Sequence, residues 1–163
     1  MVRIVPFETN SHRPEALDVA LRAWEPVFPL LEDAVPSFVY RSFYPEGWRK
    51  RQKDDLTTVL AQEPENVDVA LSGSALVGWV CTRIHPEDSM GEIYVLAVDP
   101  EWQRQGVGRM LMRHSTARAK SAGMHMVMVE TGDDSGHTAA RLAYESDGFE
   151  RWPVARYFRD ISD

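Results

Sequence analysis

The sequence predicts a mixed α/β domain built around one sheet, and three observations support this. The length of 163 residues suits one domain with a single core, residues 1–163. Strand-like and helix-like apolar patterns alternate along the chain, with no repeat, linker or low-complexity segment. The stretch 91–123 reads as a buried strand, a glycine-containing turn and a helix in direct succession.

The first sixty residues predict one strand and two helices. Val2–Phe7 alternates around a charged residue and reads as a short strand. A helix is expected to open at Pro14 and to end at the prolines that follow Trp24. The aromatic-rich segment Val27–Trp48 contains further prolines, so it is expected to be a loop with short helical pieces. A second helix is expected over Glu46–Gln62.

The middle of the chain predicts a hairpin and then a central strand. Val67–Leu71 and Ala75–Ile84 flank the turn Ser72-Gly73-Ser74, which is the pattern of a β-hairpin. Gly78 interrupts the second of these strands and indicates a bulge or a close backbone approach. Ile93–Val98 is an apolar run short enough to be a buried strand.

A glycine turn and a helix follow this central strand. Asp99-Pro100 ends the strand, because proline cannot donate to a ladder. Gly106 and Gly108 let backbone N–H groups turn toward a ligand, and the helix N-terminus adds partial positive charge. This junction is therefore an anion site, most naturally for phosphate. The helix is expected to stop at Ala122-Gly123. Its predicted apolar face consists of Val107, Met110, Leu111, His114 and Ala117.

The remaining residues predict two more strands around one more helix, and a final strand. Met124–Glu130 alternates and reads as a strand. Thr138–Asp147 reads as a helix that ends at Gly148. Another strand is expected to begin at Phe149, and a last one to cover Val154–Ile161.

Composition and charge narrow the classes of function. The net charge of −7 argues against nucleic acid as a partner. Five basic and no acidic residues lie between Trp102 and Gly123, and this charge suits a polyanionic cofactor. For Arg113, Arg118 and Lys120, a solvent-exposed helix face is an equally good interpretation. The lone Cys81, the lack of a spanning apolar run and the lack of a signal peptide indicate a cytosolic protein without membrane association. No Cys/His cluster suggests a metal.

Two motifs resemble those of a known family. Val98-Asp99-Pro100 followed by Gln103, Gly106 and Gly108 is similar to the acetyl-CoA signature Gln/Arg-x-x-Gly-x-Gly/Ala of the GNAT superfamily of acyl-CoA-dependent N-acyltransferases. The segment Ala140–Phe149 resembles the second motif of that family, Ala-Arg-x-x-Tyr-x-x-x-Gly-Phe. In pattern, the resemblance covers roughly residues 67–158.

This resemblance implies a fold, a co-substrate and an acceptor. The fold is an α/β (α+β) GNAT-like domain with a mixed, mostly antiparallel central sheet flanked by about four helices. The expected reaction transfers an acetyl group from acetyl-CoA to the primary amine of a small molecule or peptide, by direct attack in a ternary complex. A homodimer is possible, as often in the family. Thr138 stands where the family often has asparagine. The residues implied at the cofactor are Leu96, Ala97, Val98, Gln103, Arg104, Gln105, Gly106, Val107, Gly108, Arg109 and Thr138.

The chemistry of amide formation selects the candidate catalytic residues. An amine with a pKa of about 10.4 must lose a proton, and the departing thiolate, with a pKa of about 8.5, must be protonated or stabilised. By resemblance Tyr144 is the acid that protonates the sulfur. Glu92 is the leading base, although it could simply face solvent; His137 and His85 are weaker alternatives. Carbonyl polarisation would fall to a backbone N–H near Leu96–Val98.

Other interpretations of these features stay open. His114 is expected to be a core residue and Cys81 an inert small hydrophobe rather than a nucleophile. The aromatic residues of 27–48 are acceptor-pocket candidates by resemblance, or ordinary packing residues. A non-catalytic acyl-CoA-binding sensor or partner domain is the alternative function. An unrelated phosphate- or nucleotide-binding module would explain the glycine turn but not the motif around Tyr144.

Overall fold

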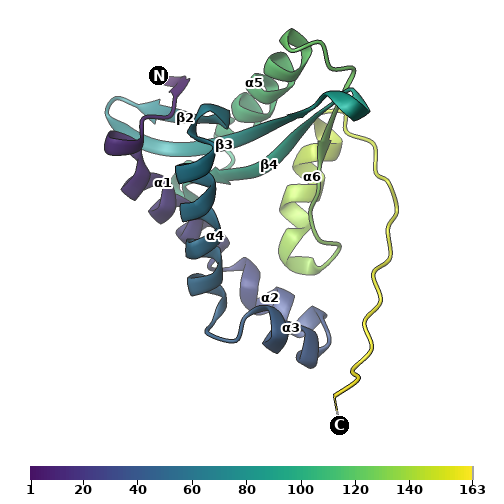
Figure 1. Ribbon diagram of the computed structural model, residues 1–163. Coiled ribbons are helices and arrows are strands. Elements are labelled where there is room, and N and C mark those ends of the chain that lie inside the picture. Colours follow the sequence, from purple (N-terminus) through teal and green to yellow (C-terminus); the bar gives the residue numbers. More distant parts are fainter. Residues whose placement is uncertain (163) are drawn as a thin grey trace.

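The computed structural model describes residues 1–162 and has the α/β (α+β) architecture that the sequence predicts (Figure 1). Within this range no helix combines the length and the apolar character that a membrane crossing requires. In the described part of the chain, four short 3-10 turns connect the main elements: η1 (Pro64–Asn66), η2 (Pro86–Asp88), η3 (Pro100–Trp102) and η4 (Ser135–His137). The main elements are, in order, β1 (Val2–Pro6), α1 (Thr9–Trp24), α2 (Val27–Ala34), α3 (Ser37–Phe43), α4 (Trp48–Gln62), β2 (Val67–Ser72), β3 (Ala75–His85), β4 (Met90–Val98), α5 (Val107–Ser121), β5 (Met126–Val129) and α6 (Thr138–Ser146).

The sheet is mixed and mostly antiparallel, as predicted. Its strands lie in the order β1-β2-β3-β4-β5, so neighbours in sequence are neighbours in space. The pairs from β1 to β4 are antiparallel, and β4 and β5 are parallel. The parallel pair arises because α5 connects β4 to β5 as a crossover, which only a parallel pair requires.

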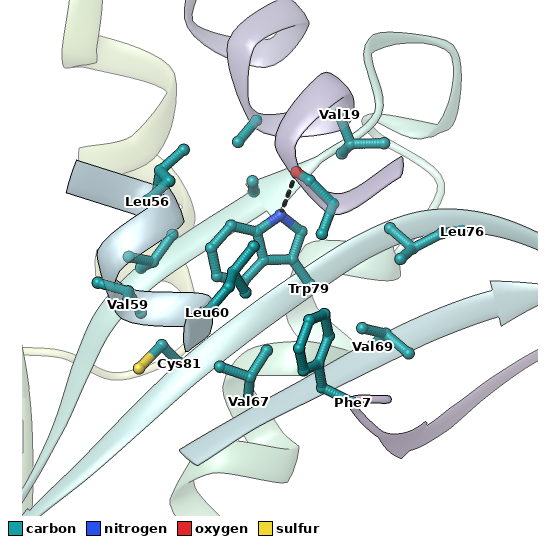
Figure 2. Packing of buried hydrophobic residues seen from close by; sticks show 14 of the residues in the cluster. Phe7, Val19, Leu56, Val59, Leu60, Val67, Val69, Leu76, Trp79 and Cys81 are labelled. Atoms are coloured by element: carbon teal, nitrogen blue, oxygen red, sulfur yellow. Dashed lines mark hydrogen bonds between the residues drawn. The ribbon is translucent and has the colours of Figure 1, made fainter. Parts of the chain in front are cut away.

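Helices α1 and α4 cover one face of the sheet over the larger apolar cluster. Trp79 of β3 is fully buried at its centre, and its indole Nε1 donates a hydrogen bond to the carbonyl oxygen of Ala16, at 2.8 Å (Figure 2). The ring therefore buries a large apolar area without leaving its N–H unpaired. Around it lie Phe7, Val19, Leu56, Val59, Leu60, Val67, Val69, Leu76, Cys81, Val95 and Ala97.

Helix α5 covers the opposite face, and its close approach explains a glycine in β3. A Cβ atom on Gly78 would lie 2.9 Å from the carbonyl oxygen of Ala97 and 3.1 Å from Cδ1 of Leu111. The β2–β3 register also shifts beside Gly78, between Ala70 and Leu71. Gly78 thus marks both a bulge and a close approach, the two possibilities that the sequence left open.

The buried face of α5 is rotated relative to the prediction. Met110 is 39% exposed and Ala117 is exposed. The face that contacts the sheet consists of Val107, Leu111, Met112, Ser115 and Ala119. The apolar pattern misplaced the face because one buried position is polar: Ser115 Oγ lies 2.8 Å from Thr82 Oγ1, which satisfies both hydroxyls inside the core.

The helices of the N-terminal half are more extensive than predicted. Helix α1 begins at Thr9 and contains Pro14, which was expected to open it. The N–H groups of Ser11 and His12 both donate to the carbonyl of Glu8, so the first turn forms ahead of the proline. The segment predicted as a loop with short helical pieces forms two helices, α2 and α3.

Within residues 1–162 no strand follows α6, so the prediction of strands there was wrong. Residues 150–162 have no regular secondary structure and are exposed. They run beside α6 toward α3 (Figure 1). Side chains tie the segment down: Arg151 pairs with Glu145 at 2.7 Å, and the Phe158 ring meets that of Phe43 edge to face, with centroids 5.9 Å apart. Alternating apolar and polar residues favour a strand only where a neighbouring strand is available for hydrogen bonding, and this segment has none within the described chain. Pro153 also lacks the backbone N–H that pairing in a sheet requires.

Candidate active site

Strand β4 separates from β5 halfway along its length. The parallel pairing runs from Met90, opposite Met126, to Ile93, opposite Val129. β4 continues to Val98, so the edge of Tyr94–Val98 that faces away from β3 has no strand partner among residues 1–162. Tyr94 is the extra residue of a bulge against β3, which bends the strand where the separation begins. An extended ligand could therefore pair with the free backbone groups of this edge.

The glycine turn lies at the end of this free edge. Gly106 has a φ of +89° and caps α5, a left-handed conformation that suits glycine. The first three N–H groups of α5, from Val107 to Arg109, have no partner within the helix. A Cβ at Gly108 would meet only Val98 Cγ2, at 3.7 Å. The turn thus presents amide donors and the positive end of a helix dipole to an anion.

The other predicted residues of the turn have distinct positions. The Gln103 side chain donates to the Val98 carbonyl oxygen at 3.2 Å, and that of Gln105 donates to the Glu101 carbonyl oxygen at 2.6 Å. Both amides therefore shape the turn itself. Arg104 has a φ of +60°, is exposed, and forms no ion pair with residues 1–162. Its guanidinium is the cation of the turn that is available to a ligand.

Much of the positive charge on α5 is neutralised by other elements. Arg109 Nε and Arg113 Nε lie 3.6 Å and 3.5 Å from Oδ1 of Asp147, beside the end of α6. Arg118 Nη1 and His114 Nε2 lie 2.9 Å and 3.0 Å from Oδ2 of Asp68 on β2, a carboxylate that is buried. His114 is thus a half-exposed neighbour of the Asp68 carboxylate rather than a core residue. Asp147 and Asp68 anchor α5 and were not singled out in the sequence, since nothing local reveals an ion-pair partner.

Tyr144 of α6 faces the sheet next to the free edge of β4. Its half-buried side chain packs on the apolar cluster that includes Ile93 and is bordered by Leu96 and Val98. Burial raises the pKa of the Tyr144 hydroxyl above its usual value. The hydroxyl donates no hydrogen bond within residues 1–162. It is therefore a protonated donor at neutral pH with its hydrogen free for a ligand.

The Gly-Phe end of the second motif has a structural reason. Gly148 has a φ of +94°, which ends α6 and turns the chain back. The N–H of Phe149 then donates to the carbonyl of Tyr144 at 3.1 Å, and the two rings lie 5.9 Å apart. The motif thus fixes the orientation of Tyr144 through Phe149.

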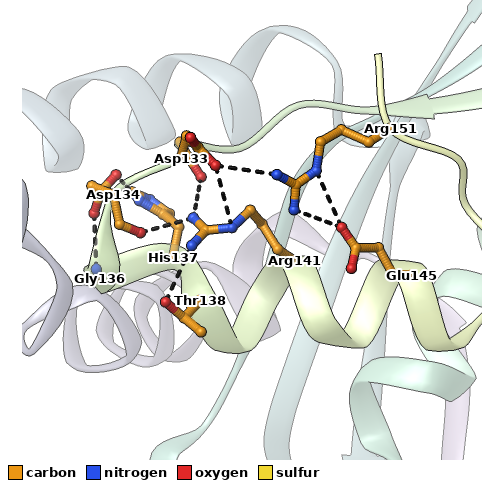
Figure 3. A network of polar contacts seen from close by, with 9 residues as sticks. Asp133, Asp134, Gly136, His137, Thr138, Arg141, Glu145 and Arg151 are labelled. Atoms are coloured by element: carbon orange, nitrogen blue, oxygen red, sulfur yellow. Dashed lines mark hydrogen bonds and ion pairs between the residues drawn. The ribbon is translucent and has the colours of Figure 1, made fainter. Parts of the chain in front are cut away.

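Arg141 holds the loop that leads into α6, a role that its place in the sequence motif does not reveal. Its Nη1 donates to the carbonyls of Gly132 and Asp134 at 2.7 Å and 2.8 Å, and its Nη2 to Thr138 Oγ1 at 3.2 Å (Figure 3). In the same loop His137 Nδ1 lies 2.6 Å from Asp134 Oδ1. Thr138 is exposed at the first turn of α6, where its hydroxyl can also reach a ligand.

Glu92, the predicted base, has a side-chain partner on the neighbouring strand. Glu92 precedes Ile93 on β4. Because side chains alternate along a strand, the Glu92 and Ile93 side chains lie on opposite faces of the sheet. The Glu92 carboxylate Oε2 is 2.7 Å from Nε2 of His85, the last residue of β3. The structure therefore brings together the leading base and one of its weaker alternatives. No hydrogen bond joins Glu92 to Tyr144 within residues 1–162.

A comparison with known families identifies the chain. Residues 24–149 match the model of the acetyltransferase (GNAT) family. The chain belongs to this family. The match spans the free edge of β4, the glycine turn and the Tyr144 motif, and it confirms the family resemblance that the two sequence motifs indicated.

Curated relatives of this GNAT chain carry a more specific name. A mycothiol acetyltransferase from Thermobispora bispora is 36% identical over 169 residues, which cover 94% of this chain and 54% of that protein. A mycothiol acetyltransferase from Kocuria rhizophila is 32% identical, with 97% of this chain and 49% of that protein covered. The GNAT chain thus spans about half the length of these relatives.

Solved structures share the fold. A PaiA N-acetyltransferase from Thermoplasma acidophilum, in complex with coenzyme A, has a TM-score of 0.68 at 13% identity, covering 95% of this chain and 93% of that one. The ribosomal-protein-S18-alanine N-acetyltransferase from Escherichia coli has a TM-score of 0.65 at 22% identity, covering 99% and 86%. These likenesses confirm the GNAT-like fold.

The aromatic residues of the N-terminal half pack mainly on one another. The Phe28 and Trp48 rings stack at 4.4 Å, and Tyr44 meets Phe28 edge to face at 5.4 Å. A shallow hollow of about 210 Å³ beside them is lined by Phe43, Tyr44, Arg51, Gln52 and Asp55. Phe43 and Tyr44 are among the aromatic acceptor-pocket candidates, but the hollow includes none of the predicted catalytic or cofactor-binding residues.

Proposed function

We propose that this GNAT chain transfers an acetyl group from acetyl-CoA to a primary amine by direct attack in a ternary complex. The observation that carries the proposal is the free edge of β4, Tyr94–Val98, with the glycine turn at its end and Tyr144 beside it. An extended amide-containing chain can pair with such an edge, while a phosphate binds the helix N-terminus.

The residues around this edge fit acetyl-CoA. The unpaired amides of Val107–Arg109 and the guanidinium of Arg104 would hold the pyrophosphate, which carries negative charge. The backbone of Leu96–Val98 would pair with the pantetheine arm, and one of its N–H groups would polarise the thioester carbonyl. Thr138 would add a hydroxyl contact from α6. Arg109 would contribute less charge than Arg104, because Asp147 already pairs with it.

The reaction divides among these groups so that every proton is accounted for. Glu92 accepts a proton from the ammonium form of the acceptor, and the freed amine nitrogen attacks the thioester carbon. The new C–N bond forms as the C–S bond breaks, and Tyr144 donates its proton to the departing sulfur. The raised pKa of Tyr144 keeps that proton in place until the sulfur becomes negative. As the amide forms, the nitrogen loses its second proton, which returns through water to the Tyr144 oxygen, and Glu92 releases the first proton to solvent. The products are an amide, the free thiol of CoA and one proton.

The acceptor class is inferred from the relatives and from charge. Relatives that align with nearly the whole chain are named mycothiol acetyltransferases, so a mycothiol-related amine is the first acceptor to test. Outside residues 102–123 the chain is strongly acidic, which favours a cationic amine. Cytosolic location and homodimer formation stay predictions from the sequence.

A thiol-release assay tests this function. Acetyl-CoA would be offered with a panel of mycothiol-related amines, polyamines, aminoglycosides, amino acids and short peptides, with CoA binding followed by calorimetry. Tyr144→Phe is expected to lower kcat by about 100-fold with CoA affinity unchanged, because only the proton donor is lost. Tyr157→Phe, which changes a tyrosine that is 91% exposed in the C-terminal segment, serves as the matched control. CoA binding without turnover for any amine would favour the acyl-CoA sensor, and no CoA binding would refute the proposal.

A further inference from the structure

We propose that His85 and Glu92 form one proton-accepting unit, in which His85 takes the amine proton from Glu92 and releases it to solvent. The inference rests on the proposed function and adds a relay residue to it. In this assignment Glu92 contacts the acceptor amine, and His85 acts through Glu92. The protonation state of His85 decides whether the Glu92 carboxylate can accept a proton from the amine.

The geometry follows from the register of β3 and β4. His85 is opposite Met90, and Arg83 is opposite Glu92, so His85 and Glu92 are diagonal neighbours on one face of the sheet. The two side chains meet with Nε2 and Oε2 at 2.7 Å. This distance is that of a strong, charge-assisted hydrogen bond.

Exposure increases along the pair toward solvent. The Glu92 side chain is 19% exposed and that of His85 is 31% exposed. On the far side of the imidazole, Nδ1 lies 3.5 Å from the carboxylate of Glu87, which is 68% exposed. A proton on His85 can therefore leave through Nδ1 to water or to Glu87 without passing back through the site.

The charges around His85 are consistent with this direction. Glu92 from β4 and Glu87 from η2 are the charged groups that act on it, and the hydrogen bond to Glu92 is the main cause that raises the pKa of His85. Arg83, the nearby cation on the same face, is bound to Glu63 at 2.7 Å and stacks 3.4 Å from the centre of the Tyr94 ring. Arg83 is thus committed elsewhere.

The proton balance of one turnover is simple. We assign the 2.7 Å contact to the protonated pair, in which imidazolium Nε2 donates to Oε2. Before reaction the pair has lost one proton, so neutral His85, with its hydrogen on Nδ1, presents the lone pair of Nε2 to Glu92. Glu92 takes a proton from the acceptor ammonium and passes it to Nε2, which leaves an imidazolium beside a carboxylate. The Nδ1 proton then leaves to solvent, and exchange of one proton with water, gained at Nδ1 and lost at Nε2, restores the starting Nδ1–H tautomer. An imidazolium that has not yet lost its proton cannot accept another, so turnover requires a pH at which the pair is deprotonated.

The pH dependence of kcat tests the relay, measured with saturating acetyl-CoA and the best amine. In the wild type, kcat should rise with pH along a limb whose apparent pKa lies above 6.5, the usual value for histidine. His85→Gln should lower kcat about tenfold or more and move this limb to lower pH, because the imidazole no longer takes part in the titration. The control is His125→Gln, which removes an exposed histidine at the same end of the sheet, where its backbone N–H donates to the Ser89 carbonyl. This change should alter neither kcat nor the apparent pKa of the limb. An unshifted limb in His85→Gln would overturn the relay.

A titration of the histidine side chains by NMR tests the coupling without any turnover. His85 in the wild type should titrate above 6.5 and should return toward that value in Glu92→Gln. A wild-type His85 that titrates as an ordinary histidine would refute the pair. A wild type with the coupled titration but without acetyl transfer to any amine would refute the proposed function instead, and with it the use of the pair in catalysis.

Discussion

The guanidinium of Arg22 and the carboxylate of Asp99 meet at 2.7 Å, although 77 residues separate them in the sequence. Asp99 is buried at the end of β4, and its other oxygen accepts the N–H of Glu101 at 2.9 Å. The ion pair therefore ties α1 to the first residue after the free edge, directly ahead of the glycine turn. This contact fixes where the turn begins.

Replacing Arg22 by methionine is expected to destabilise the protein by about 1–2 kcal/mol at pH 7, because Asp99 would keep a buried charge without its partner. Arg22 holds the pKa of Asp99 below its usual value. The contribution is therefore fully present above the unfolded pKa of about 3.9 and is lost as the pH falls through the folded value. Denaturant unfolding at several pH values measures this.

The control for Arg22→Met is Asp18→Asn. Asp18 also accepts from Arg22, at 2.7 Å, but its side chain is 64% exposed. Its loss should change the free energy of unfolding by less than about 0.5 kcal/mol. A loss of stability in Arg22→Met that is equally large at acid pH would contradict the role given to Asp99.

Gly91 gives α5 room to lie on β4. A Cβ atom at this position would lie 2.5 Å from Cβ of Ala119, so Gly91→Ala is expected to lower stability by about 2 kcal/mol. Ala119→Gly removes the clashing methyl and by itself costs about 1 kcal/mol of helix propensity. In a double-mutant cycle the pair should cost clearly less than the sum. Strict additivity of the two changes would show that the helix avoids the methyl in some other way.

Trp79→Phe tests the core under α1 and α4. The smaller ring leaves a cavity and removes the donor to the Ala16 carbonyl, so the expected loss is about 2 kcal/mol in the free energy of unfolding. The change in the midpoint of chemical denaturation measures it. Trp152→Phe, at a tryptophan that is 85% exposed, is the matched control and should have little effect. Equal effects at both positions would mean that Trp79 is not the centre of the core.

Cys81 should resist thiol reagents in the native state. It is fully buried, and burial raises its pKa to about 12, so little reactive thiolate is present at neutral pH. Ellman's reagent should label it only as fast as the protein opens, and at once in denaturant. Rapid labelling of the folded protein would show that the core around Cys81 opens readily, and would reopen a role for this thiol.

The sequence alone determined the features that depend on neighbouring residues. Local backbone preferences account for four of them: the strand end at Asp99-Pro100, the glycine cap of α5, the helix end at Ala122-Gly123 and the turn at Gly148. The family motifs are equally local, so the family and the fold class could be inferred from them. These features can be predicted from the sequence because a single short stretch of residues specifies each conformation.

The tertiary structure decided what distant residues do to one another. The partner of Glu92 is His85, which the β3–β4 register selects, and the partners of Arg109 and Arg113 come from α6. The buried face of α5 depends on Ser115, which pairs with Thr82 of β3. The residues after Phe149 that were predicted as strands do not pair with the sheet. The physical reason is that hydrogen-bond partners, ion pairs and ladder positions are set by contacts between elements far apart in the chain. Periodicity within one element contains no information about those contacts.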